Sequence, residues 1–160
     1  MDPKHSYNLF KLLMNINRKF LEKGDNGSKF RTRARDIPAQ VRSVGLAYTM
    51  LYLYSKATDK GYRHVLKIMN GGEEEASEKS NNRNNVKSEE LSHAIYLYII
   101  KWLLDEVVGY RDKVSDDDIK SYISSLLREN ERDSMAYGQI LIPYLLMVKR
   151  FAEAMYQSEQ

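Results

Sequence analysis

Apolar residues recur at the spacing of an α-helix along most of the 160-residue chain, and runs that alternate apolar and polar positions are scarce. Residues 6–23 form the first amphipathic segment, and Gly24 is suited to cap its C-terminal end. The core face predicted for this helix consists of Tyr7, Phe10, Leu13, Met14, Asn17, Phe20 and Leu21. Only 8 Gly and 3 Pro are present, and no Asn-Gly turn joins two alternating runs. The pattern predicts an all-α fold.

Further helices are predicted before residue 71. Asp36 and Pro38 indicate a break or a fresh start within residues 29–44, because proline disfavours helical backbone at the residue that precedes it. Residues 45–60 are apolar or aromatic at nearly every position from Leu46 to Tyr54, which is typical of a helix that is central to its bundle or covered by a partner. A short helix over residues 62–69 should end at the two glycines that follow.

Residues 71–88 differ in composition from everything before them. They contain three consecutive Glu, four Asn and no apolar residue larger than Val86. Such a segment cannot bury enough apolar surface to offset the entropy of ordering it. We predict a mobile polar loop inside one domain, because the preceding 70 residues would form a poor core alone.

The helical pattern returns after this loop. An apolar stripe runs from Leu91 to Leu103, and Gly109 should end that helix. Ser115, followed by Asp116, Asp117 and Asp118, has the composition of an N-cap and an acidic first turn, which predicts a helix that continues through residue 127. The core face predicted for this helix is Ile119, Tyr122, Ile123, Leu126 and Leu127. The last helix, over residues 134–156, should be kinked at Pro143. Its predicted core face is Tyr137, Leu141, Tyr144, Leu145, Val148, Phe151, Ala152 and Met155. We therefore predict a single domain over residues 1–160, a compact bundle of about six to seven helices.

Composition narrows the possible chemistry. The chain contains no Cys, which excludes disulfide frameworks, thiol nucleophiles and iron–sulfur clusters. Its longest apolar runs fall far short of the roughly 20 residues that a membrane-spanning helix needs. We therefore expect a soluble, cytoplasmic protein with no membrane partner.

Candidate catalytic groups are few. His5, His64 and His93 are isolated, and no His-Glu-x-x-His pair is present. The chain lacks a Gly-rich loop able to hold a nucleotide phosphate, and the N-cap explanation accounts for the three consecutive aspartates. We expect no catalytic residues, no metal site, no cofactor and no enzymatic activity.

The net charge of +3 hides a division along the chain. Residues 1–70 hold 14 Lys and Arg against 5 Asp and Glu, a net charge of +9, while residues 71–160 hold 11 against 17, a net charge of −6. The most basic stretch runs from Lys29 to Arg35, and Asp36 is its only local acidic neighbour, so most of its cations are expected to lack acidic partners. Arginine makes bidentate contacts with phosphate, so this stretch indicates a surface that contacts the backbone of a nucleic acid. A solvated helical face with local ion pairs is the alternative interpretation.

The tyrosines of the apolar segment allow two interpretations. Tyr48, Tyr52 and Tyr54 could stack on bases, but their spacing on an apolar helix favours packing in the core or at a subunit interface. No helix-turn-helix, zinc-finger or RNA-recognition signature is present. Any nucleic-acid contact should therefore be to backbone and shape, with salt-dependent affinity.

Two blocks of the chain resemble a known family. The block Ala34-Arg-Asp-Ile-Pro-Ala-Gln-Val-Arg-Ser-Val-Gly-Leu46, continuing into Leu51-Tyr-Leu-Tyr-Ser-Lys56, is similar to the small helical subunit of type III-B CRISPR (Cmr) effector complexes. The closing block Val148-Lys-Arg-Phe-Ala-Glu-Ala154 is similar to the last helix of that family. The resemblance covers residues 34–60 and 140–155, and chain length and helix order agree elsewhere.

The resemblance implies a non-catalytic scaffold subunit of an antiviral, RNA-guided complex. Several copies would stack beside the backbone subunits and the large subunit, and would line the channel that holds guide RNA and target RNA. Base pairing would read the sequence, while protein subunits would supply positive charge. The residues expected to contact RNA are Arg31, Arg33, Arg35, Arg42, Lys56, Lys149 and Arg150. Of these, Arg31 and Arg33 lie outside the matching blocks and rest on charge alone.

Two alternatives to this function stay open. One is a free-standing helical adaptor whose basic half binds an acidic protein and does not contact RNA. The other is a small helical nuclease with a dispersed site.

Overall fold

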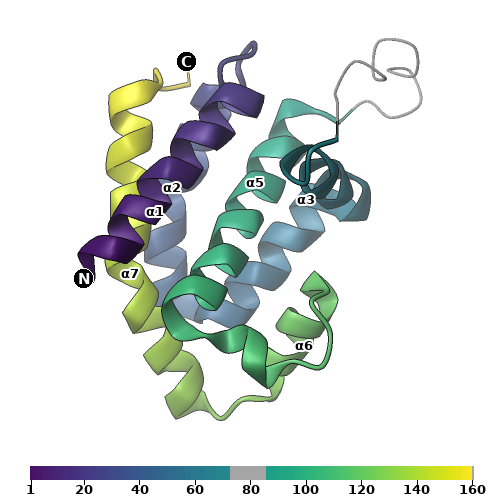
Figure 1. The fold of residues 1–160 in the computed structure, drawn as a ribbon, viewed down its shortest axis with the longest axis vertical. Coiled ribbons are helices and arrows are strands. Elements are labelled where there is room, and N and C mark those ends of the chain that lie inside the picture. The colour runs from purple at the N-terminus through teal and green to yellow at the C-terminus, as the bar shows by residue number, and fades with distance from the viewer. Residues whose placement is uncertain (73–85, 160) are drawn as a thin grey trace.

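The structure, a computed structural model, describes residues 1–72 and 86–159, and within these ranges it contains helices and no strand (Figure 1). The all-α prediction is confirmed. The elements in chain order are α1 (Pro3–Ile16), the π-helical turn η1 (Asn17–Leu21), α2 (Asn26–Val44), α3 (Leu46–Met69), α5 (Ser88–Leu103), the π-helical turn η2 (Leu104–Val108), the 3₁₀ turn η3 (Tyr110–Lys113), α6 (Ile119–Arg128) and α7 (Glu131–Met155). Most of the polar segment predicted to be a mobile loop, residues 71–88, lies outside the described residues.

Helix α5 is the centre of the bundle. Every residue from Leu91 to Leu97 is buried, and so are Ile99, Ile100 and Leu103. It packs most extensively against α3 and then against α2, while α2 in turn packs against α7 (Figure 1). The central position therefore belongs to α5, whereas the first half of α3 exposes Tyr48, Leu51 and Tyr52.

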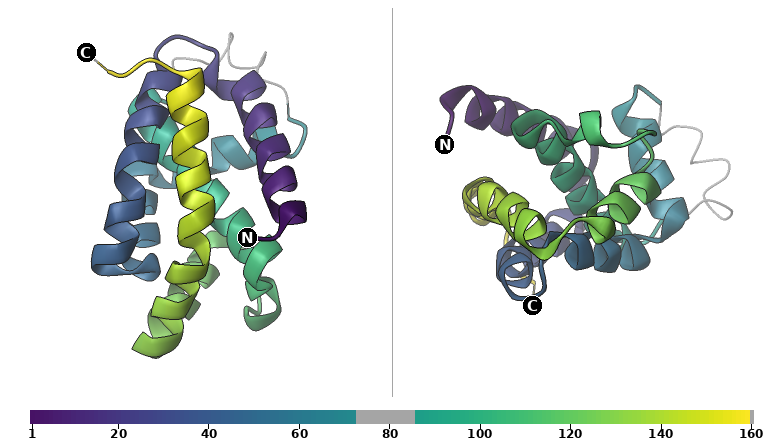
Figure 2. Two further views of the ribbon diagram at one scale, coloured as in Figure 1. Left: turned by 90° about the vertical axis from the view of Figure 1, so that its left-hand side faces the viewer. Right: turned by 90° about the horizontal axis from the view of Figure 1, so that it is seen from below.

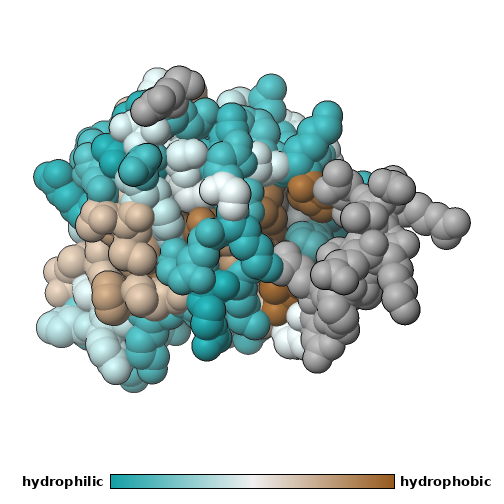
Figure 3. Space-filling view, turned by 90° about the horizontal axis from the view of Figure 1, so that it is seen from above, coloured by the Kyte–Doolittle hydropathy of each residue, from teal (hydrophilic) through white to brown (hydrophobic). Residues whose placement is uncertain are grey.

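The predicted core face of the first helix is partly wrong. Asp2 caps α1 by accepting a hydrogen bond from the Lys4 backbone N–H at 2.9 Å, and the helix buries Leu9, Leu13 and Ile16. Tyr7, Phe10 and Met14 are exposed instead, at 63%, 47% and 41%. The apolar positions of α1 cover more than one face, and only one of these faces meets the bundle. Apolar side chains accordingly gather on the side of the molecule where α1 and α7 lie (Figure 3).

The break predicted at Asp36 and Pro38 is wrong, because α2 continues without interruption to Val44. Pro38 is buried in the helix and leaves the carbonyl of Ala34 without its usual backbone donor. Packing of α2 between α5 and α7 compensates for that lost bond, and the buried side chains of Phe30, Ile37 and Val41 contribute to it.

The two helices predicted over residues 45–60 and 62–69 are confirmed as two segments of α3, but the division lies at Thr58, three residues before the predicted one at residue 61. The backbone of Thr58 has φ 63° and ψ 159°, which interrupts the helix. Its hydroxyl accepts a hydrogen bond from the Gly61 backbone N–H at 3.2 Å and donates to Glu90 Oε2 at 3.3 Å. Thr58 therefore caps the second segment and ties it to α5.

The helical segment that continues from α5 through η2 ends at Gly109, as predicted, but α6 does not begin where the sequence predicted. Gly109 adopts φ 72° and ψ 28°, a left-handed conformation that ends the preceding turn. The N-cap of α6 is Asp118, not Ser115, and the helix begins at Ile119. Asp117 instead accepts hydrogen bonds from Lys101 Nζ and from Arg111 Nη2, each at 2.8 Å. These cations lie 6 and 16 residues before Asp117, outside the N-cap pattern from which the helix start was predicted.

The last helix begins slightly earlier than predicted. The Asn130 side chain caps it by accepting a hydrogen bond from the Asp133 backbone N–H at 2.8 Å. Pro143 lies inside α7, and the first half of the helix leans away from the line of the second half (Figure 2). The predicted core face is buried except for Met155, which is 43% exposed. In the part of the chain that the structure describes, we find no helix of the length and apolarity that crossing a membrane demands.

Candidate nucleic-acid interface

Six of the seven residues predicted to contact RNA belong to the helices α2 and α7. Arg31 Nη1 donates hydrogen bonds to the carbonyl oxygens of Tyr156 at 2.7 Å and Glu153 at 3.4 Å. At the other end of the pair, Val41 lies against Gly138. These two contacts fix α2 and α7 as antiparallel neighbours, and both carry basic residues along this length. We call the set Arg31, Arg35, Arg42, Lys149 and Arg150 the α2–α7 seam.

Most cations of the α2–α7 seam face solvent. Arg42 is exposed, and the side chains of Arg35 and Arg150 are 61% and 82% exposed. Arg35 Nε pairs with Asp36 Oδ1 at 3.0 Å, and this hydrogen bond raises the pKa of the guanidinium. Arg150 Nη1 lies 3.5 Å from Glu153 Oε1. Exposed pairs of this kind contribute only about 0–1 kcal/mol, so a phosphate can compete for the arginines.

Arg31 is occupied within the protein. It binds carbonyl groups at the C-terminal end of α7, where a helix leaves its last carbonyls without intrahelical donors. The adjoining Tyr156 hydroxyl donates to Asn17 Oδ1 at 2.6 Å. Arg31 thus joins α2 to the end of α7, and its assignment to RNA stays a prediction.

Arg33 points to the other side of α2, toward α5. Its Nη1 lies 2.9 Å from His93 Nε2 and 3.5 Å from Glu89 Oε1, and the side chain is only 16% exposed. A guanidinium has no acceptor, so Nε2 of His93 accepts and Nδ1 carries the proton that is donated to the Glu89 carbonyl oxygen at 2.7 Å. Burial lowers the pKa of His93, and the positive charge of Arg33 lowers it further. Arg33 is therefore engaged in a contact between helices.

The expectation that the basic stretch of α2 lacks acidic partners is wrong. Lys29 Nζ lies 3.1 Å from Glu159 Oε2 and 3.5 Å from Glu89 Oε2. The hydrogen bond to Glu159 is the main cause of the raised pKa of Lys29, and Thr32 and Lys29 together lower the pKa of Glu159. Because these acids lie 60 and 130 residues from Lys29 along the chain, local counting could not identify them. Folding leaves a smaller set of open cations than the sequence suggested.

Lys56 lies apart from the α2–α7 seam. It is exposed on α3, with its Nζ 5.9 Å from the centre of the Tyr52 ring. That ring meets His93 edge-on at 6.0 Å, which places Lys56 on the α5 side of α2 together with Arg33. The structure therefore divides the predicted residues into a seam of five and a second group of two. Among the three tyrosines, Tyr48 is 61% exposed, Tyr52 is 38% exposed, and Tyr54 is partly buried with its hydroxyl donating to Asp59.

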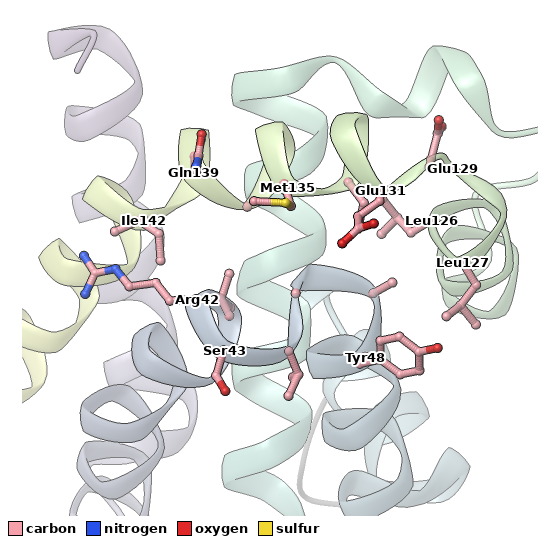
Figure 4. A pocket seen from close by; sticks show the side chains of 16 residues that line it. Arg42, Ser43, Tyr48, Leu126, Leu127, Glu129, Glu131, Met135, Gln139 and Ile142 are labelled. Atoms are coloured by element: carbon pink, nitrogen blue, oxygen red, sulfur yellow. The ribbon is translucent and has the colours of Figure 1, made fainter.

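A groove that the sequence did not indicate adjoins one end of the α2–α7 seam. It has a volume of about 860 Å³ and lies between the α2–α3 corner and the junction of α6 with α7 (Figure 4). Its apolar lining includes the exposed side chains of Val44, Tyr48, Leu127 and Met135, and Arg42 lies at its edge. Leu127 was predicted to lie in the core, but it is 43% exposed. The groove forms where the ends of four helices meet. The hydrophobic periodicity of a single helix therefore cannot predict it.

The fold and the surface together define a class of protein: a small helical bundle that carries a row of exposed cations along one antiparallel helix pair, suited to an anionic partner. The family described as CRISPR-associated protein (Cas_Cmr5) matches residues 8–155 of this chain. The CRISPR system CMR subunit Cmr5 of Saccharolobus solfataricus is 27% identical over 128 residues, which cover 79% of this chain and 78% of that protein. No solved structure matches.

The chain belongs to the Cmr5 family of CRISPR-associated proteins. The resemblance drawn from residues 34–60 and 140–155 is thereby confirmed.

Proposed function

We propose that this protein is a non-catalytic small subunit of a type III-B CRISPR (Cmr) effector complex and that it lines the path of guide and target RNA in several copies. Its partners would be the backbone and large subunits, neighbouring copies of itself, and the RNA. Family membership supports the place in the complex. The observation that supports the RNA contact is the set of exposed cations Arg35, Arg42 and Arg150, with the partly exposed Lys149, along the α2–α7 seam.

The chemistry of these four residues agrees with a sequence-independent contact. Their acidic neighbours are exposed and compete weakly, whereas Arg31 and Arg33 are held by contacts inside the protein. A few open cations per copy give modest affinity, and repetition along a strand multiplies it. A stack of copies would therefore bind an RNA of any sequence firmly while each contact stays reversible.

The proposal is tested by changing the seam residues and measuring RNA affinity. A variant with Arg35, Arg42, Lys149 and Arg150 all replaced by Ala should bind single-stranded RNA at least about tenfold more weakly, with a flatter dependence of affinity on salt, because each lost phosphate contact removes about 0.7 from the slope. Fluorescence anisotropy with labelled RNA of two unrelated sequences provides the measurement. The matched control replaces four cations on other elements, Arg18, Arg63, Lys67 and Lys120, and should retain affinity within about twofold.

The groove supports a second candidate function, the binding of a protein segment, which differs from the free-standing adaptor because it uses an apolar surface and not the basic half. Its apolar rim, formed by Val44, Tyr48, Leu127 and Met135, is suited to a protein segment and not to RNA. If the seam variant binds RNA normally while Val44→Lys and Met135→Lys abolish association with other Cmr subunits, this protein-binding function replaces the RNA-lining function.

A further inference from the structure

A second cavity, of about 340 Å³, lies between the second segment of α3, the C-terminal end of α5 and residues 111–119. It shares no lining residue with the α2–α7 seam. Its aromatic walls are Tyr62, Tyr98 and Trp102. Its charged lining consists of three carboxylates and two cations, namely Asp105, Asp117, Asp118, Lys101 and Arg111. We call this site the α3–α5 cavity.

The cations of the α3–α5 cavity are already paired. Arg111 Nη2 and Lys101 Nζ each lie 2.8 Å from a carboxylate oxygen of Asp117, and Lys101 also pairs with Asp105 at 3.3 Å. Asp105 also accepts a hydrogen bond from the Tyr122 hydroxyl. The carboxylate of Asp118 is exposed and has no side-chain partner among the described residues. Three negative charges therefore face two positive ones, and the unmatched carboxylate is Asp118.

A buried hydroxyl in the same cavity is also without a partner. Tyr62 is 2% exposed, and its oxygen forms no hydrogen bond among the described residues. Burial is the main cause of its raised pKa, and Tyr98 and the carboxylates of Asp117, Asp118 and Asp105 add to it. The hydroxyl therefore interacts electrostatically with the carboxylates that line the cavity, although it forms no hydrogen bond with them. An unpaired buried hydroxyl costs free energy. Its oxygen is closed to solvent, so a ligand donor reaches this acceptor only when the lining side chains move apart.

The charges, aromatic rings and apolar surface of the lining determine which class of ligand the cavity can bind. A phosphate group would meet a net negative site whose two cations are already bound, so RNA is disfavoured there. Aromatic faces and carboxylates together attract a cation through the ring quadrupole and through charge. The walls also provide apolar surface for a short alkyl stem, and the donors of such a cation can reach an oxygen acceptor.

We propose that the α3–α5 cavity binds an alkyl-ammonium or guanidinium group, supplied either by a free polyamine or by a Lys or Arg side chain of a neighbouring protein subunit. Trp102 lines the cavity and is the only tryptophan of the chain, so its fluorescence reports occupancy directly. The probes are agmatine, as a free amine and guanidinium, and N-acetyl-arginine methylamide, as a mimic of a protein side chain. Both should change the Trp102 emission saturably, and inorganic phosphate should not.

Two variants and one control locate the interaction. Asp118→Asn keeps a residue that is equally favoured at the N-cap position of α6. It should weaken binding of both probes about fivefold, the size expected from losing one partly exposed ion pair. Tyr62→Phe should weaken binding without lowering the melting temperature, because it removes a hydroxyl that has no partner in the free protein. Asp116→Asn changes an exposed carboxylate that does not line the cavity and should leave affinity unchanged.

The outcomes separate the sources and decide the proposal. Tighter binding of agmatine assigns the site to a small amine, and tighter binding of the capped arginine assigns it to a side chain of a subunit. An equal or larger response to phosphate would overturn the proposal, as would an Asp118→Asn affinity equal to that of the unchanged protein. Absence of a saturable response to either probe at millimolar concentration would overturn it as well.

Discussion

At the scale of the single residue, Thr58 combines a backbone that costs free energy with a side chain that offsets part of the cost. Its φ of 63° and ψ of 159° lie in a region that is almost exclusive to glycine, and such a conformation costs about 1–3 kcal/mol. Its hydroxyl caps the second segment of α3 and reaches Glu90. The two effects can be separated by substitution.

We expect Thr58→Gly to be more stable than Thr58→Ala by about 1–2 kcal/mol in the free energy of unfolding. Both variants lose the cap, but glycine also relieves the backbone strain while alanine retains it. Urea denaturation of the two variants and of the unchanged protein measures the difference. Equal stability of the glycine and alanine variants would contradict the strain at this position.

At the scale of the elements, the contact between α2 and the end of α7 sets strict limits on side-chain size. Gly27 lies in the first turn of α2 beneath the ring of Tyr156, and an added Cβ would overlap that ring and approach the Leu21 carbonyl oxygen to 3.0 Å. Gly61 in α3 differs, because the nearest atoms to an added Cβ lie at 3.7 Å, an ordinary contact distance. These two helical glycines form a matched pair.

We expect Gly27→Ala to lower the free energy of unfolding by about 1–3 kcal/mol through overpacking. Gly61→Ala should raise the free energy of unfolding by about 0.5–1 kcal/mol, because alanine restricts the unfolded chain and fits the helix. Thermal and urea denaturation of both variants test the pair. Destabilisation by Gly61→Ala as large as that by Gly27→Ala would contradict the packing described at Tyr156.

The elements also show which features the sequence could predict. Helical periodicity identified the all-α fold and the presence of two segments in α3, and the glycine signal identified the stop at Gly109, because spacing and glycine conformation act within a few residues. It failed at Pro38, where burial between neighbouring helices keeps the helix intact, and at Ser115, because Asp118 caps α6. Local patterns also gave α1 an incorrect core face, because only the bundle determines which apolar side chains it covers.

In the candidate site, too, the sequence predicted features that depend on nearby residues and missed those that depend on tertiary contacts. Arg35, Arg42, Lys149 and Arg150 are exposed or partly exposed cations, as charge counting and the family resemblance indicated. Charge counting could not reveal that Glu89 and Glu159 would reach Lys29 or that Arg33 would pair with His93. The groove and the α3–α5 cavity depend on tertiary contacts between segments distant in the chain, so neither was predicted.

At the scale of the whole molecule, stability should depend on pH through two partly or fully buried histidines. Burial is the main cause of the lowered pKa of both His93 and His64, and nearby cations lower each further. The unfolded chain binds protons at the ordinary pKa of about 6.5, whereas the folded protein resists protonation. The stabilising contribution is therefore present above pH 6.5 and is lost as the pH falls toward the lowered pKa values of the folded state.

We expect the free energy of unfolding to decrease as the pH falls below about 6.5. His93→Gln keeps a side chain able to donate and accept but does not titrate, so it should flatten the decrease. Urea denaturation between pH 5 and pH 8, for both proteins, measures the slopes. A variant whose slope equals that of the unchanged protein would show that His93 is not responsible.

The burial of α5 has a consequence for how the protein tolerates mutation. A helix with one buried face shows alternating permissive and restrictive positions, with a period of about 3.6 residues. Residues 91–97 have no exposed position, so a saturation-mutagenesis scan should find an unbroken band of intolerance there, while α7 should show the periodic pattern. Sequence drift within this family should accordingly avoid the middle of the bundle and accumulate on the outer helices.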